Sequence, residues 1–168
     1  VSRTVAMSNK YFGGVLENAG AKEDVDDDLI ATVTGAYEKV RAKINEFKIS
    51  DALSEIFVIF KRANKYIDET MPWALAKDES KTARLKTVLY NLAESIVIGT
   101  SLLEPFMPDT AAKVTSYFGT TVRDYGRIVR FGGIETVSYT HLTLPTRKKS
   151  SIRRTKCTRQ GKNPLLPK

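Results

Sequence analysis

The sequence contains a single cysteine, Cys157, and a single histidine, His141, among its 168 residues. Both lie after residue 136, and neither has a partner of its own kind. Metal clusters and disulfides need several such ligands, and a nucleophilic cysteine needs a base held beside it. We therefore expect no metal site, no disulfide and no catalytic nucleophile.

Long hydrophobic runs are also missing. The longest apolar stretches, such as residues 56–60 and 96–98, are far shorter than the roughly 20 residues that a membrane-spanning helix needs. The start of the chain has no signal-peptide pattern. We expect no membrane segment, and the 42% hydrophobic content is ordinary for one globular domain with its own core.

Acidic residues are absent from the end of the chain. Residues 1–136 hold 18 Lys and Arg against 19 Asp and Glu, which gives 18 − 19 = −1, whereas residues 137–168 hold nine basic residues and no acid. The formal charge of +8 therefore belongs to the tail. The globular part therefore cannot attract nucleic acid through an overall positive field. One possible function, that of a basic-tailed nucleic-acid-binding protein, depends wholly on residues 147–168.

Apolar residues recur at steps of three and four along most of residues 1–118, which predicts amphipathic helices. Residues 1–12 indicate a helix that stops at two glycines, and three aspartates at 26–28 open a continuous helix to about Phe47, where they complement the helix dipole. Ser50 can cap a third helix. The apolar stripes of the second and third helices are formed by Leu29, Ile30, Val33, Tyr37, Val40, Ile44 and Phe47, and by Leu53, Ile56, Phe57, Phe60, Ala63 and Ile67.

A fourth helix is predicted over residues 85–103, and a short fifth one opens at Pro108 and closes at Gly119. Gly99 inside the fourth helix indicates a close helix crossing. Helices of this kind bury their stripes only against one another, so the predicted fold is all-α, an antiparallel bundle of about five helices.

The junction at residues 62–77 joins the third helix to the chain's one tryptophan. Proline disfavours helical geometry in the residue before it, so Met71 should end the helix and Pro72 should fix the turn that presents Trp73. Two interpretations of the ring remain open. It either fills the core of the bundle or stands at a stiff helix corner as a recognition surface.

Three cations, Lys61, Arg62 and Lys65, lie on the third helix away from its stripe. Lys65 and Glu69 have the spacing of an ion pair within a helix. The cationic face is either solvated surface or a set of phosphate contacts near Trp73.

Three regions follow from these patterns: a helical domain over residues 1–118, an irregular strap over 119–136 and a non-native or disordered tail over 137–168. Residues 137–146, VSYTHLTLPT, resemble the translation of an adapter used in DNA sequencing libraries. The following residues are basic and lack apolar spacing, as in a disordered arm or an arbitrary reading frame.

Residues 64–73, NKYIDETMPW, with AKDE at 76–79, resemble the anticodon-binding domain of bacterial methionyl-tRNA synthetases, whose version reads NKYIDExxPWxLAK. Residues 2–14, SRTVAMSNKYFGG, and 103–108, LEPFMP, extend the similarity over about the first 118 residues. The resemblance implies a helical bundle of the class Ia synthetase type. It also implies a cytoplasmic parent enzyme, a methionine–tRNA ligase that uses ATP with magnesium.

The HIGH-type and KMSKS-type signatures of that family's catalytic domain do not occur in this chain. We therefore expect the chain alone to be catalytically inactive, to bind no cofactor, and to work with an N-terminal catalytic domain. The resemblance assigns anticodon binding to Arg3, Pro72 and Trp73, where the tryptophan stacks on an anticodon base and the arginine contacts the loop of methionine tRNA. Two further family positions, one and two turns before Arg3, lie outside the sequence.

An alternative of a different class is a helical bundle that binds other proteins and has no RNA role. In that interpretation Trp73 is a buried anchor.

Overall fold

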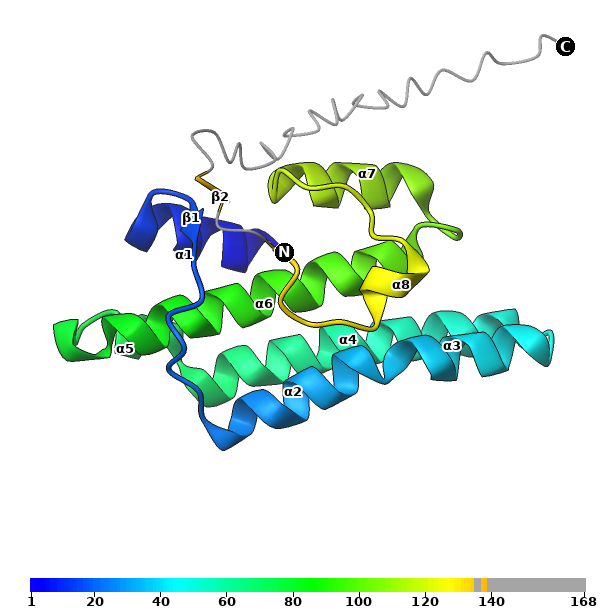
Figure 1. Cartoon of the computed structure of the whole chain (residues 1–168), viewed down its shortest axis with the longest axis horizontal. Coiled ribbons are helices and arrows are strands. Elements are labelled where there is room, and N and C mark those ends of the chain that lie inside the picture. Colours follow the sequence, from blue (N-terminus) through cyan, green and yellow to red (C-terminus); the bar gives the residue numbers. More distant parts are fainter. Residues whose placement is uncertain (135–136, 139–168) are drawn as a thin grey trace, which may run out of the picture.

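Helix α6 (Thr82–Leu103) runs through the middle of the molecule and the other helices surround it (Figure 1). The computed structural model describes residues 1–134 and 137–138. Along the chain its other elements are α1 (Ser2–Phe12), β1 (Val15–Leu16), α2 (Asp24–Thr34), α3 (Ala36–Asn45), α4 (Ile49–Thr70), α5 (Pro72–Leu75), a 3-10 turn (Glu79–Lys81), α7 (Pro108–Tyr117), α8 (Tyr125–Ile128) and β2 (Val137–Ser138).

Nearly every residue of α6 from Arg84 onwards is buried, around the whole circumference of the helix. Helices α1, α2, α4, α5 and α7 all pack against it. Helices α2 and α3 run in one direction, α4 returns, and α6 runs parallel to α2 again (Figure 1). The predicted all-α antiparallel bundle is confirmed, and α6 is its core element because a helix buried on all sides needs neighbours on all sides.

Gly99 marks the close approach of α4 and α6. A Cβ atom at this position would lie 3.0 Å from Cζ of Phe60 and 3.2 Å from Cγ2 of Ile59. The missing side chain lets the two backbones come together, as the sequence predicts.

Two helix boundaries differ from the predicted ones. The single helix predicted up to Phe47 is interrupted at Gly35, which keeps right-handed angles (φ −78°, ψ −10°), so α2 and α3 remain almost in line. Helix α3, the second part of the predicted helix, ends at Asn45. Phe47 has φ 59° and is 90% exposed. Phe47 therefore belongs to the reversal into α4 and not to the apolar stripe. Ser50 lies inside α4 and does not cap it.

Asp26 is the centre of a buried polar network that ties α2 to α4 and α6. Its carboxylate accepts two bonds from the Arg84 guanidinium, at 2.6 and 2.9 Å, and one of 2.6 Å from the Tyr66 hydroxyl. The Glu23 backbone N–H donates to it at 3.0 Å in a capping box. Complementing the helix dipole is thus the lesser part of what Asp26 does.

Glu94 holds the strap against α6 through a second buried pair. The Arg123 guanidinium donates to both of its carboxylate oxygens, at 2.8 and 2.9 Å, and the Ile134 N–H donates to one of them. The Tyr90 hydroxyl donates to the Ile134 carbonyl at 3.0 Å. The strap is therefore a packed part of the domain between Arg123 and Ile134, and it contains the short helix α8.

Strands β1 and β2 form a two-residue antiparallel ladder, with Val15 opposite Ser138 and Leu16 opposite Val137. This ladder includes the first two residues of the predicted tail. The rest of that tail, residues 139–168, lies outside the described residues. Within the described part of the chain, no helix is both long enough and apolar enough to span a membrane.

The Asp26 network predicts that replacing Asp26 lowers the free energy of unfolding much more than replacing its neighbour Asp27. Asp26→Asn leaves the buried Arg84 charge with only the exposed carboxylate of Glu23, 3.2 Å away, within the described residues, and should lower the free energy of unfolding by roughly 3 kcal/mol. Asp27→Asn is the matched control, because Asp27 is exposed and its ion pair is with exposed Lys22, and it should cost less than about 1 kcal/mol. Urea unfolding of both variants measures the difference, and equal losses would contradict the network's role.

The same carboxylate predicts a dependence of stability on acid. Burial pushes the pKa of Asp26 up, but bonds from Arg84, Tyr66 and the Glu23 N–H outweigh burial and hold the pKa below its ordinary value of 3.8. The unfolded chain then takes up the proton first. The stability that ionised Asp26 contributes to the folded state is present above about pH 4 and is lost as the pH falls through the folded-state pKa. Urea midpoints between about pH 6 and pH 3 should fall more steeply for the unmodified chain than for Asp26→Asn, and parallel curves would contradict this.

Candidate functional site

The corner between α4 and α5 has the predicted geometry. Helix α4 ends at Thr70, and Met71 follows in a left-handed conformation with φ 42° and ψ 63°. The Met71 N–H still donates to the Ile67 carbonyl at 3.0 Å, and its own carbonyl accepts from the Ala74 N–H at 2.8 Å. Pro72 is the first residue of α5. The chain therefore turns sharply at Met71 without losing its hydrogen bonds.

Trp73 projects from this corner into solvent. Its exposed fraction is 46%, and that of Met71 beside it is 48%, whereas Pro72 is buried. A core plug would be enclosed, so this interpretation of Trp73 is wrong. Buried Pro72 fixes the backbone before the ring, and the indole presents a flat apolar surface that a planar partner can stack on.

The corner has a rigid base. Helix α5 packs against α6, and Leu75 and Ala76 contact the core. One turn before the end of α4, Tyr66 is fully buried and bonded to Asp26. The Trp73 backbone is thus held between the core helix and the Asp26 network.

Arg3 stands on the exposed side of α1, opposite buried Thr4 and Val5. It forms no ion pair within the described residues. In Figure 1, α5 lies at one end of α6, whereas the N-terminal end of α1 lies over the middle of it. Arg3 and Trp73 therefore stand on two different elements that both pack against α6.

The three cations of α4 differ in what they contact. Lys61 and Lys65 are exposed, and Lys65 Nζ lies 3.5 Å from a Glu69 carboxylate oxygen, which confirms the predicted pair. The Arg62 side chain is only 9% exposed. Its nitrogens donate to Asp28 at 2.5 Å, to Glu69 at 2.9 Å and to the Val25 carbonyl at 3.3 Å. Arg62 therefore joins α4 to α2. Neither alternative considered for it, solvated surface or phosphate contact, fits this residue, because every guanidinium nitrogen already has a protein acceptor.

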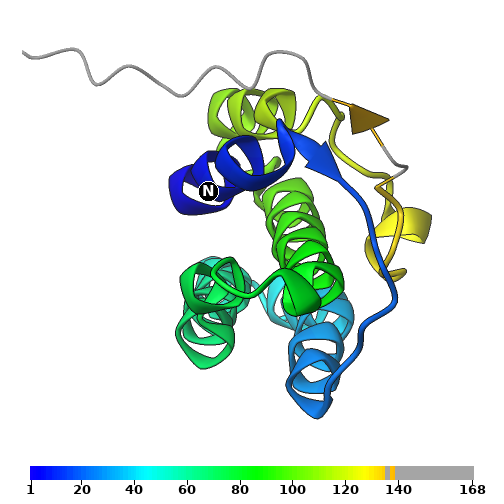
Figure 2. The same ribbon diagram turned by 90° about the vertical axis from the view of Figure 1, so that its left-hand side faces the viewer.

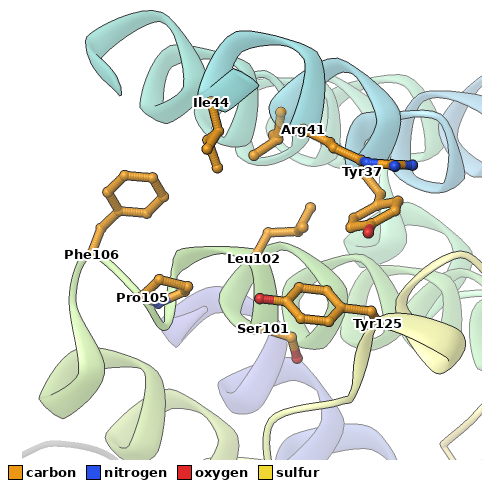
Figure 3. Close-up of a pocket in the computed structure, with 9 residues that line it drawn as sticks. Tyr37, Arg41, Ile44, Ser101, Leu102, Pro105, Phe106 and Tyr125 are labelled. Carbon is orange, nitrogen blue, oxygen red and sulfur yellow. The ribbon is translucent and has the colours of Figure 1, made fainter. Parts of the chain in front are cut away.

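An apolar hollow of about 160 Å³ lies between α3, the end of α6 and α8, away from Trp73 (Figure 3). Tyr37 and Tyr125 approach each other across it, with ring centroids 5.7 Å apart, and Leu102 and Phe106 line it. Sequence reasoning missed this hollow, because its residues come from three separate segments. It carries no acid, base or nucleophile cluster, and the described residues include no group of His, Cys, Asp and Glu that could hold a metal.

A family model described as the anticodon-binding domain of methionyl-tRNA ligase matches residues 16–131. A methionine–tRNA ligase of Caldanaerobacter subterraneus is 51% identical over 121 residues, which cover 72% of this chain and 19% of the relative. The ligase of Clostridium perfringens is 45% identical over 133 residues, 79% of this chain and 21% of the relative. The chain thus spans about a fifth of the length of these curated relatives.

Solved structures give the same result. Methionyl-tRNA synthetase of Mycobacterium tuberculosis in its free state matches 75% of this chain and 26% of its own, with a TM-score of 0.70 and 32% identity. The same enzyme bound by methionyl-adenylate matches 85% of this chain and 29% of its own, with a TM-score of 0.73 and 32% identity.

The exposure of Trp73 predicts a small effect on folding when the ring is removed. Trp73→Ala should lower the free energy of unfolding by roughly 2 kcal/mol or less, since nearly half of the residue is already exposed to solvent. Phe118→Ala, at a fully buried aromatic residue, is the control and should cost roughly 3 to 5 kcal/mol. Urea unfolding compares them, and a loss at Trp73 as large as at Phe118 would restore the core-plug interpretation.

Proposed function

The chain belongs to the methionine–tRNA ligase family, and from this premise we propose that it recognises the anticodon of methionine tRNA. The observation that carries the proposal is Trp73, 46% exposed on a corner that Pro72 and α6 hold in place. The family match over residues 16–131 supports the proposal, because it includes this corner.

The chemistry of an anticodon loop suits an exposed indole. Its bases are single-stranded and can leave their stack, so a protein reads them by aromatic stacking and by hydrogen bonds to base edges. Stacking of one base contributes about 1 to 3 kcal/mol. The rigid corner lowers the cost of ordering the ring when the base arrives.

Arg3 supplies a second kind of contact. Its guanidinium is a planar fork of donors that fits a base edge or a phosphate. Arg3 and Trp73 stand on different elements that pack against α6, and both would contact the one loop. Lys61 and Lys65 are the candidate phosphate contacts on α4. Residues 1–136 have a net charge of only 18 − 19 = −1, so binding depends on such local cations.

We assign no catalytic step to the residues of this chain. In the proposed enzyme, activation of methionine by ATP with magnesium and its transfer to tRNA belong to the part of the polypeptide that this chain does not span. This domain's contribution is to select the tRNA and hold it. The alternative protein-binding role took Trp73 as a buried anchor, and its exposure removes that support.

Trp73 is the one tryptophan of the chain and therefore reports on its own contact. Adding methionine tRNA should quench its fluorescence with saturation, because a base stacks on the ring. A tRNA that differs only in its anticodon should bind more weakly, and the ratio of the two affinities cancels the shared attraction of the basic tail. Equal quenching by both tRNAs would contradict the proposal.

Substitution separates stacking from other roles. Binding of labelled methionine tRNA to Trp73→Ala should be weaker by roughly 5- to 150-fold, with loss of anticodon discrimination, since one stack is removed. Trp73→Phe keeps an aromatic face and should recover part of the affinity. Urea unfolding of both variants is the control for folding. An alanine variant that still discriminates anticodons would rule out the role of Trp73.

A further inference from the structure

The strap carries three arginines that surround one hollow. Arg123, Arg127 and Arg130 line a space of about 220 Å³ together with the loop of residues 131–133. Residues 1–134 hold 18 Lys and Arg against 18 Asp and Glu, so these three arginines are a local concentration of positive charge in a balanced domain.

Arg123 forms one wall of the hollow and is already neutralised. It is buried, and its guanidinium donates to both oxygens of Glu94. Gly133 lies flat against it, and a Cβ atom there would come within 3.1 Å of Arg123 Cζ. The glycine therefore lets the loop close over the guanidinium, and Glu94 fixes the position of that wall.

Arg127 and Arg130 differ from Arg123 because both are exposed and neither forms an ion pair within residues 1–134. In sequence, Asp124 is the nearest acid to Arg127 and Glu135, outside the described residues, is the nearest to Arg130. The Asp124 carboxylate accepts the Arg127 backbone N–H at 3.0 Å and so caps α8. Among residues 1–134, three arginine charges less that of Glu94 leave two positive charges beside the hollow.

The backbone adds donors of its own. Among the described residues, the N–H groups of Phe131, Gly132 and Gly133 have no hydrogen-bond acceptor. Gly132 has φ 94°, a conformation that favours glycine. Consecutive free N–H groups beside a positive-φ residue form the kind of concavity that binds anions.

We propose that this hollow binds a phosphate group. Two guanidinium forks and successive N–H groups match the several oxygens of a phosphate, and two uncompensated positive charges match a dianion. Its source is either the backbone of an RNA or free phosphate. We name the hollow the strap site, made of Arg127, Arg130 and the loop of residues 131–133.

The strap site goes beyond the proposed anticodon contacts and does not depend on them. Figure 2 shows α8 on one side of α6, and α1 and α4 on the opposite side. Arg3, Lys61 and Lys65 therefore stand on helices across the core from the strap site.

The amide resonances of Gly132 and Gly133 provide the test, because they report on this loop and not on the basic tail. Inorganic phosphate and a single-stranded RNA without a methionine anticodon are each titrated into the ¹⁵N-labelled full chain. We expect saturable shifts of both glycines. In Arg127→Gln/Arg130→Gln the affinity should fall roughly tenfold or more, because two charge-assisted contacts are lost. The matched control, Lys39→Gln/Lys113→Gln, removes two exposed charges from α3 and α7 and should change nothing.

The two titrations, with inorganic phosphate and with RNA, identify the source of the bound phosphate group. Saturation by phosphate alone assigns free phosphate, whereas tighter saturation by RNA assigns a nucleic-acid backbone. In the RNA case the double arginine variant should also flatten the slope of log affinity against log salt by about 1.4, for two phosphate contacts on a single strand. Absence of saturable glycine shifts with both ligands, or identical shifts in the arginine variant, would overturn the strap site. Neither result bears on Trp73, whose anticodon test is separate.

Discussion

The burial of α6 on all sides is the constraint on which the other elements depend. Two charged side chains, Arg84 and Glu94, are enclosed with this helix, and an unpaired charge in such surroundings costs several kcal/mol. Each must therefore meet an opposite charge from another element. Asp26 on α2 pairs with Arg84, and Arg123 in the strap pairs with Glu94. The apolar residues supply the driving force for packing, and these pairs determine which segment lies where.

The Trp73 corner depends on the first of these pairs. Tyr66 shares the carboxylate of Asp26 with Arg84, so the last turns of α4 are joined to α2 and α6 at one point. Burial and the neighbouring Asp26 charge both raise the pKa of Tyr66, which keeps its hydroxyl protonated as a donor. A fixed helix end followed by a proline leaves the Trp73 backbone few conformations. An exposed ring thus stands on a constrained backbone.

The strap depends on the second pair in the same way. Arg123 and the Ile134 N–H both bind Glu94, which fixes the segment between them with α8 inside it. Burial and the nearby Glu94 raise the pKa of Tyr90 to about 12, so its hydroxyl remains a donor to the Ile134 carbonyl. The strap site is therefore held by a built structure, although its residues read in sequence as an irregular connection.

Local patterns in the sequence determined the helices, the sharp corner at Met71, the close crossing at Gly99 and the family. Each of these depends on residues a few positions apart, or on a motif contiguous in the chain, such as residues 64–73. Tertiary structure alone decided that Trp73 is exposed, that Arg62 is occupied by Asp28 and Glu69, and that Asp26 faces Arg84 58 residues away. The physical reason is that burial and charge pairing depend on neighbours from distant segments. Spacing along one helix shows which way a side chain points but not what it meets there.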